Sequence, residues 1–299
     1  MLLADSLHLA LRAITAQRLR SFLTLLGIAV GIAAVILLTS IGEGIHRFVL
    51  AEFSQFGTNV IGIHPGKTKT GGSPSGLPTS ARPLSLDDAR ALASLPNVVA
   101  MTPSIWGNAE VGANGRLRRT SVYGVGPQML EVFKGKVRAG QFLPPEDADH
   151  ARALVVLGPK LKEELYGPEN ALGTRLRIGP DQFRVVGVLE AKGQFLGIDL
   201  DDTAFVPAAR ALEIFNREGL NEINLAAEEG VPSRLVADAV RERLIARHGR
   251  EDFTIITQEE MLATLSNILN VLTMAVGALG GISLLVGGVG IGTIITITV

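Results

Sequence analysis

Two long apolar runs enclose a segment of mixed apolar and polar residues. Residues 22–41 and 261–299 contain no Asp, Glu, Lys or Arg. A helix of about 20 residues is about 30 Å long at 1.5 Å per residue, which matches the hydrocarbon core of a bilayer. The pattern therefore predicts a membrane-spanning helix at 22–42 and a second one within the later run.

The second apolar run is too long for a single span. It follows Thr257, which begins the sequence Thr-Gln-Glu-Glu, a capping box that predicts a helix start. A helix from there to residue 299 would be about 60 Å long, twice the bilayer core. We therefore expect 258–274 to form a stalk outside the membrane and 275–299 to span it. A helical hairpin broken at one of the Gly-Gly pairs is the alternative, and the lack of a polar turn disfavours it.

The segment between the runs, residues 43–257, predicts an α+β domain. Its periodicity indicates two strand–helix–strand units far apart in the sequence, which together form one split βαβ module. The expected elements are the strand 59–63, a helix capped by Ser85 and the strand 97–106, followed much later by the strand 222–227, a helix from Pro232 and the strand 253–257. A linker rich in Gly, Ser, Thr and Pro, 66–78, lies within the first unit.

A β-rich insertion is predicted between the two units, at about 111–206. The dipeptide Asn114-Gly115 separates two alternating runs, and it favours the positive φ angles of a two-residue hairpin turn. A second hairpin is expected around Gly179-Pro180, and a short helix at 160–166. The fold class is therefore α+β, with two transmembrane helices flanking a large extracytoplasmic domain.

Charged residues set the expected orientation. All but four of the 28 basic and 29 acidic side chains lie within 42–260. Three of those four, Arg12, Arg18 and Arg20, precede the first run. The positive-inside rule then places residues 1–21 in the cytoplasm and the domain outside it. A cleaved signal peptide is the alternative, which the length of the first run and the existence of the second disfavour.

Glycines recur at four-residue spacing in both apolar runs. In lipid, such ridges let helices approach closely and gain van der Waals contact. We therefore predict helix packing in a multi-helix assembly, against the alternative that glycine is simply common in membrane helices. The predicted packing residues are Gly27 and Gly31, Gly277 and Gly281, and Gly288 and Gly292.

Composition and short motifs give no support for catalysis or for a cofactor. The net charge of −1 does not favour nucleic acid as a partner, and without cysteine there is no disulfide or thiolate metal site. The tripeptide Gly66-Lys67-Thr68 resembles the end of a phosphate-binding loop, but it lacks the first glycine and the helix start. Large apolar side chains such as Trp106 and Phe195 are expected in the core, the alternative being partner contacts.

The candidate metal ligands are also weak. The cluster Asp199–Asp202 could bind a cation, but oxygen-ligand loops usually supply more carboxylates, so a solvated turn is favoured. The histidines have no paired metal-ligand spacing and are each expected at the surface or near the membrane. They are His8, His46, His64, His150 and His248.

Seven short motifs carry a family resemblance. They are RSFLTLLGIAVGIAAVI (20–36), GEG (42–44), FGTNVI (56–61), PG (65–66), ALGT (171–174), FRVVGVL (183–189) and LLVGGVGI (284–291). In this order, along nearly the whole chain, they resemble the MacB/FtsX-type ABC transporter permeases, with a MacB-like periplasmic core domain at 43–257. Each motif alone is weak, and the combination is specific.

The resemblance implies a plasma (inner) membrane protein that works as a homodimer or paired permease with an ABC ATPase, fused or separate. In MacB-like members, ATP-driven motion of the stalk and the periplasmic domain drives export, and a periplasmic adaptor protein is a further partner. Members continue beyond the position of Val299 with a charged cytoplasmic helix and two more spans. We therefore expect this sequence to be a fragment, the alternative being a truncated product.

Three functions follow as expectations. The first is a permease subunit for efflux of a drug, peptide or lipid-like compound, or for lipoprotein release. The second is an FtsX-like scaffold that regulates a cell-wall enzyme, and the third is an anchored binding domain without transport. The large two-part outer domain favours the first.

Overall fold

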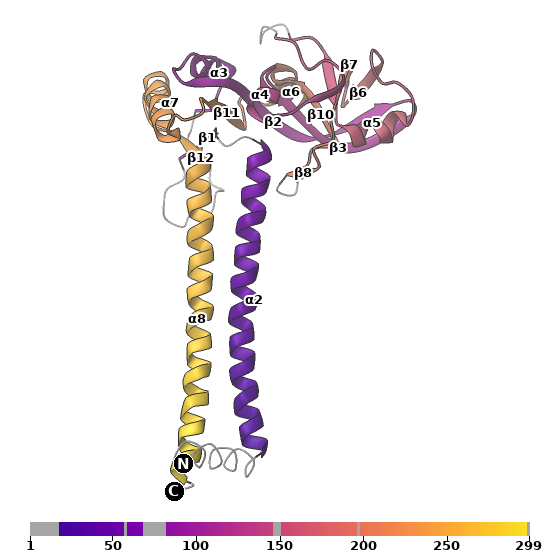
Figure 1. Ribbon diagram of the computed structural model, residues 1–299. Helices are drawn as coiled ribbons and strands as arrows, with labels where there is room; N and C mark the ends of the chain where they lie inside the picture. Colours follow the sequence, from indigo (N-terminus) through magenta and orange to yellow (C-terminus); the bar gives the residue numbers. More distant parts are fainter. Residues whose placement is uncertain (1–17, 57–58, 68–81, 146–150, 196–197, 298–299) are drawn as a thin grey trace. The chain divides into compact units, whose positions relative to one another are not determined.

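The computed structural model describes residues 18–56, 59–67, 82–145, 151–195 and 198–297. The chain divides into two compact units (Figure 1). One is a helical unit of Met1–Ala51 with Leu262–Val299, and the other is a domain, Glu52–Met261. The predicted linker lies largely in 68–81, outside the described residues.

Two long helices make up the helical unit. They are α2, Arg18–Phe56, and α8, Gln258–Ile297, of 39 and 40 residues. Helix α2 continues well beyond the predicted end at residue 42, and α8 is one continuous helix, so the hairpin alternative is wrong. Across the described residues, no helix combines the length and the apolar character that crossing a membrane requires. The spans 22–42 and 275–299 therefore stay predictions.

The predicted split βαβ module is confirmed within the domain. Its strands lie in the order β12-β1-β11-β2, and β11 pairs antiparallel with both β1 and β2. Each strand–helix–strand unit therefore encloses a strand of the other. The bounds are β1 Val60–Pro65, α3 Leu86–Ala93, β2 Val98–Ala113, β11 Glu222–Ala227, α7 Ser233–His248 and β12 Phe253–Thr257.

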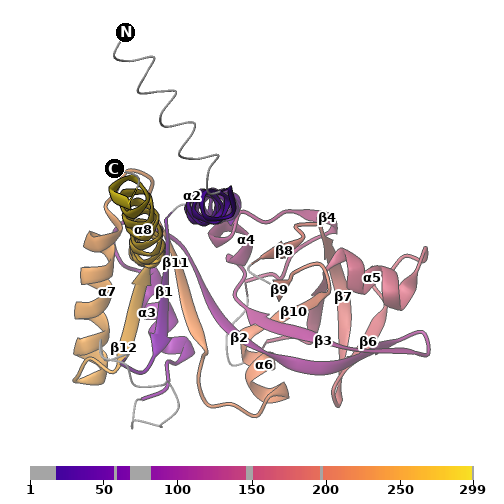
Figure 2. The same ribbon diagram turned by 90° about the horizontal axis from the view of Figure 1, so that it is seen from below.

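The β-rich insertion extends the same sheet, in the order β2-β3-β10-β5-β7-β4. Strand β6 pairs with both β2 and β7, so β2, β3, β10, β5, β7 and β6 form a closed ring (Figure 2). The bounds are β3 Arg116–Val125, α4 Met129–Val132, β4 Val137–Gly140, β5 Leu154–Leu157, α5 Pro159–Tyr166, β6 Arg175–Ile178, β7 Asp181–Leu189, β8 Gln194–Phe195, β9 Ile198–Asp199, β10 Thr203–Pro207 and α6 Ala208–Ile214.

The hydrophobic core runs through both parts of the domain. Apolar side chains of β1, β11, α3 and α7 belong to the same buried cluster as those of α5, β6 and β7. A smaller cluster lies on the other face of the insertion, around Phe205, Val156 and Leu143. The sheet is therefore apolar on one face throughout, and on its second face only in the insertion.

Local sequence signals account for several turns. Ala113 pairs with Arg116, and the intervening Asn114 and Gly115 have φ angles of 52° and 75°, which confirms the predicted hairpin. The second hairpin is confirmed by the pairing of β6 with β7 across Gly179.

The predicted helix caps are confirmed as well. Ser85 and Asp88 form the capping box of α3, with each side chain accepting from the other residue's backbone N–H. The same reciprocal bonds join Thr257 and Glu260 at the start of α8, at 3.2 and 3.4 Å. Helix α8 therefore begins directly at the end of β12.

Candidate functional site

The predicted packing glycines all lie on the two long helices. Apart from the neighbouring backbone of its own helix, a Cβ added at Gly27, Gly277 or Gly281 would have no atom within 4 Å, so these three make no close contact with another helix within the described chain. Their role in packing between chains stays a prediction. Gly27 and Gly31 lie on α2, and Gly277, Gly281, Gly288 and Gly292 lie on α8.

The arginines that set the predicted orientation lie at the start of the chain. Arg18 is the first residue of α2, and Arg20 follows in its first turn. Arg12 lies outside the described residues. The orientation itself stays a prediction.

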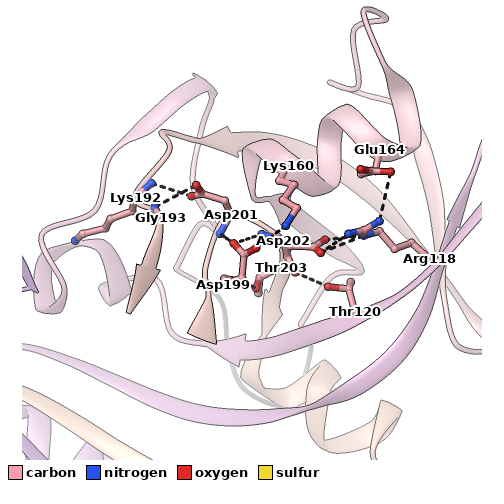
Figure 3. Close-up of polar contacts among 10 residues, drawn as sticks. All are labelled: Arg118, Thr120, Lys160, Glu164, Lys192, Gly193, Asp199, Asp201, Asp202 and Thr203. Atoms are coloured by element: carbon pink, nitrogen blue, oxygen red, sulfur yellow. Dashed lines mark hydrogen bonds and ion pairs between the residues drawn. The ribbon is translucent and has the colours of Figure 1, made fainter. Parts of the chain in front are cut away.

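The acidic turn is held by cations of its own chain (Figure 3). Arg118 donates to Asp202 from two nitrogens, Nε to Oδ1 at 2.8 Å and Nη2 to Oδ2 at 2.6 Å. Lys160 Nζ lies 2.7 Å from Asp199 Oδ2, and this hydrogen bond lowers the pKa of Asp199 against the opposing effect of burial. The turn is thereby fixed to β3 and α5.

The third carboxylate of this turn binds backbone amides. Asp201 accepts from the N–H groups of Lys192 and Gly193 at 2.8 and 3.1 Å, which closes the loop between β7 and β10. The side chain of Asp202 is only 16% exposed, so the turn is less solvated than the sequence predicted. Among the described residues, no group of three or more His, Cys, Asp or Glu side chains is placed to hold a metal ion. The carboxylates of this turn therefore have a structural role, which is to hold the turn to β3 and α5.

His248 forms a buried ionic network that the sequence analysis missed. Its side chain has no exposed surface, so the prediction of a surface position is wrong. Nδ1 lies 2.7 Å from Asp252 Oδ1, and Nε2 lies 3.2 Å from Asp88 Oδ2. Arg247 Nε donates to the other oxygen of Asp88 at 2.6 Å. The network joins α3 to the C-terminus of α7 and to the start of β12.

The two carboxylates of this network are held in the ionised form. Burial alone would raise the pKa of Asp88, but hydrogen bonds from Arg247, Ser85 and His248 outweigh it and lower the pKa to about 2. Burial is likewise outweighed at Asp252, whose pKa is lowered by the hydrogen bond from His248. Both ring contacts are hydrogen bonds only when both ring nitrogens carry protons. With both nitrogens engaged, the ring has none free to serve as a general base.

The remaining histidines are less informative. His64 lies half-buried on β1, where burial lowers its pKa, and its Nε2 is 3.6 Å from Glu222 Oε1 on β11. His8 and His150 lie outside the described residues, as does the side chain of His46. Glu222 is a further acid with a shifted pKa that the sequence did not single out. Its carboxyl is largely buried, which raises its pKa to about 7 in spite of a hydrogen bond from Asn224.

Trp106 on β2 is partly buried. Its burial is intermediate between that of the predicted core residue and that of the alternative, an exposed partner contact. Its ring lies 6.2 Å from that of Tyr123, centroid to centroid. The side chain of Phe195 lies outside what the structure describes. The ion pairs of these described side chains hold neighbouring elements of the domain together.

Comparison with known proteins decides the family. The model of the MacB-like periplasmic core domain matches residues 21–243, from the first turn of α2 into α7. The chain belongs to this family. The resemblance seen in the sequence is thereby confirmed, and the MacB-like domain here comprises the split module and its insertion.

Relatives of the MacB-like chain are named as exporters. The macrolide export ATP-binding/permease protein MacB of Hyphomonas neptunium is 33% identical over 99% of this chain, which covers 46% of that protein. The pyoverdine export ATP-binding/permease protein PvdT of Pseudomonas entomophila is also 33% identical over 99% of this chain, which covers 45% of it. The chain therefore spans about half the length of the curated relatives it matches.

Solved structures support the fold. The periplasmic region of MacB from Actinobacillus actinomycetemcomitans superposes with a TM-score of 0.60 at 23% identity, covering 72% of this chain and 95% of that one. The extracellular domain of the ABC-type transporter YknZ from Gram-positive bacteria gives a TM-score of 0.53 at 16% identity, covering 66% of this chain and 100% of that one. The mixed α/β architecture is thus that of MacB-like outer domains.

Proposed function

We propose that the chain is a permease component of an ABC-type exporter, anchored in the inner membrane by α2 and α8. The named relatives are export ATP-binding/permease proteins, which supports the export role. The charge-free runs 22–41 and 261–299 and the arginines before the first one support two spans with a cytoplasmic N-terminus. The MacB-like domain then lies outside the cytoplasm.

The partners follow from the same proposal. ATP hydrolysis belongs to an ABC ATPase, fused or separate, and the chain itself carries out no chemistry. The glycine ridges of the helical unit are the surfaces by which a second permease subunit packs in the membrane. A periplasmic adaptor protein is the expected partner of the outer domain.

The connections between the two long helices and the sheet support a transmission of motion from the helices to the domain. Helix α2 leads into β1, and β12 leads without an intervening residue into α8. The two strands are hydrogen-bonded neighbours, with Ile61 opposite Thr257 at the end where the helices attach. A displacement of the helices that ATP drives would therefore reach the sheet through one pair of strands, and the transported compound need not pass through the chain.

The test interrupts this connection. In cells that lack the chromosomal gene, susceptibility to macrolides, siderophore release and dye accumulation are measured after complementation. We expect the unaltered gene to restore export of at least one of these compounds. A short Gly-Ser insert between Thr257 and Gln258 should abolish that restoration, because a flexible segment absorbs the displacement.

A matched insert tests whether the effect is specific. The same Gly-Ser sequence placed at Gly230, in an exposed turn with φ of 87°, leaves the connection intact and should restore export. If deletion of the gene changes none of the measured compounds, the export role is wrong. If the insert after Thr257 restores export as well as the one at Gly230, transmission through this junction is wrong.

A further inference from the structure

The two faces of strand β1 differ in character. Ile61 and Ile63 are fully buried in the core, so Gly62 and His64, which alternate with them, lie on the opposite face of the sheet. The antiparallel register of β1 with β11 places Glu222 opposite His64 on that face. An imidazole and a carboxylate therefore face each other across two adjacent strands.

The distance between these two side chains does not fit a hydrogen bond. His64 Nε2 lies 3.6 Å from Glu222 Oε1. An N–H···O hydrogen bond spans only about 2.7–3.2 Å. The distance fits two ligands of one metal ion instead, because metal–ligand bonds of about 2.0–2.2 Å at a tetrahedral angle place the two ligand atoms about 3.4 Å apart. A divalent ion can therefore bridge both atoms with little movement of either side chain.

Both atoms converge over Gly62, which has no side chain to fill the space. A Cβ built there would lie 2.8 Å from Glu222 Oε1 and 3.3 Å from His64 Nε2. Asn224 Oδ1 is a third polar atom near this point, at 3.8 Å. The amide is oriented by its other end, since Asn224 Nδ2 donates to Ser104 Oγ at 3.3 Å. One nitrogen and two oxygens thus surround a single point.

Glu222 also lacks an ordinary countercharge. Its side chain is only 20% exposed, and among the described residues no Lys or Arg forms an ion pair with it. Burial raises the pKa of Glu222 to about 7 and lowers the pKa of His64. A bound cation would offset the cost of burying the carboxylate, and the neutral imidazole is the form that binds a metal.

We propose that His64 and Glu222, together with the amide oxygen of Asn224, bind a divalent transition-metal ion of the zinc type over Gly62. Imidazole and carboxylate are both ligands of Zn²⁺. Solvent completes the coordination, since the side chain of His64 is 36% exposed. An ion held here joins β1 to β11 near the last residue of β1. The export role proposed above assigns no ligand to these residues, and the site stands or fails independently of it.

Chemical modification of His64 tests the site in the unmodified sequence. Diethyl pyrocarbonate acylates free imidazole nitrogens, and peptide mapping by mass spectrometry distinguishes His64 from the other histidines. The full chain in detergent micelles is treated with the reagent over a series of Zn²⁺ concentrations, and in parallel with Mg²⁺, which prefers oxygen ligands. We expect saturable protection of His64 by Zn²⁺ and none by Mg²⁺.

Two histidines of the same chain serve as internal references. His8 and His150 are read in the same digest, and an imidazole without a second ligand binds Zn²⁺ weakly. Half-protection of His64 should therefore need at least about tenfold less Zn²⁺ than half-protection of either reference.

Two variants assign the effect to the carboxylate. Glu222→Gln keeps the shape of the side chain but removes the anionic ligand, so half-protection of His64 should require at least about tenfold more Zn²⁺. Glu242→Gln removes an acid that is exposed on α7 and should leave the protection unchanged.

The comparison among histidines needs no variant, so it decides the matter even where Glu222→Gln fails to fold. Equal Zn²⁺ concentrations for half-protection of His64 and of the reference histidines would overturn the proposal. So would equal protection by Zn²⁺ and Mg²⁺, or an unchanged requirement for Zn²⁺ in a folded Glu222→Gln chain.

Discussion

Asp88→Asn is the sharpest test of the buried network around His248. Asp88 has no exposed surface, and its two oxygens accept from Arg247, His248 and the cap residue Ser85. Asparagine has nearly the same shape, but its amide nitrogen meets donors where a carboxylate oxygen accepted. The substitution therefore removes one charge and at least one hydrogen bond from a closed site.

The size of the effect follows from the pKa of Asp88. Its value falls from 3.8 to about 2 in the folded chain, which corresponds to about 2.5 kcal/mol at 1.36 kcal/mol per unit. Breaking a buried pair costs about 3–5 kcal/mol. We therefore expect Asp88→Asn to lower the free energy of unfolding by about 3 kcal/mol at pH 7.

The pH dependence has a definite sign. A carboxyl whose pKa is lower in the folded state than in the unfolded state stabilises the fold above its unfolded value, about pH 4. That contribution is lost as the pH falls towards 2. The parent chain should therefore lose stability between pH 4 and pH 2 more steeply than Asp88→Asn, which lacks the group that titrates.

The assay is urea unfolding of the full chain in detergent micelles, followed by the emission of Trp106. With a slope of about 3 kcal/mol per molar urea, the midpoint should fall by about 1 M. Asp87→Asn is the matched control, since Asp87 is next in sequence, is 66% exposed and pairs with Arg90 three residues on. It should change stability by less than about 0.5 kcal/mol. Equal midpoints for the two variants, or equal acid profiles for Asp88→Asn and the parent, would refute the reasoning.

Two further predictions concern the helical unit. Gly31→Leu and Gly288→Leu should reduce the population of chains that cross-link in membranes, with alanine at the same positions milder, because packing is the main attraction between helices in lipid; unchanged cross-linking would mean that the glycine spacing is only compositional. A reporter enzyme that is active only outside the cytoplasm, fused after Gly76, should be active, since three arginines precede the first apolar run; activity of a cytoplasm-only reporter there would reverse the orientation.

Elements with strong local signals could be predicted from the sequence. The strands 222–227 and 253–257 have the expected bounds because alternation and flanking turns define them. The strand predicted to end at Trp106 instead continues to Ala113 as part of β2. A Cβ at Gly107, within this continuation, would lie 2.6 Å from the ring of Phe215. The glycine allows α6 to approach the strand closely, which is a tertiary reason that no local pattern reveals.

Long-range contacts explain what the sequence did not reveal about the sites. Asp88 and His248 are 160 residues apart, and only the four-residue spacing of His248 and Asp252 gave a local signal. Glu222 occupies an outward position of an alternating strand, where an acid is ordinary. Its environment becomes unusual only through β1 and β2, which place Gly62 and Ser104 beside it. The closure of the insertion by β6 likewise depends on pairing between distant strands.

The attachment of both helices to one pair of strands has a mechanical consequence. Strands β1 and β12 are antiparallel, so α2 and α8 attach at the same end of the pair. Separating the helices would peel β12 from β1 one hydrogen bond at a time, beginning at Thr257, because β12 is the edge strand of the sheet. Moving the helices together displaces both strands in the same direction, so the load passes to the hydrogen bonds between β1 and β11.

The opposite end of the same pair is locked. Gly66 N–H donates to the carbonyl of Asp252 at 2.8 Å, and Thr254 Oγ1 donates to the carbonyl of Gly66 at 2.7 Å. Asp252 in turn holds His248, which binds Asp88 of α3. A concerted displacement of the two helices would therefore be transmitted through β1 and β12 to both halves of the split module. A separation of the helices would instead detach the edge strand β12 and leave the rest of the sheet in place. Under the export role that we propose, this arrangement favours paired motion of α2 and α8 over their separation.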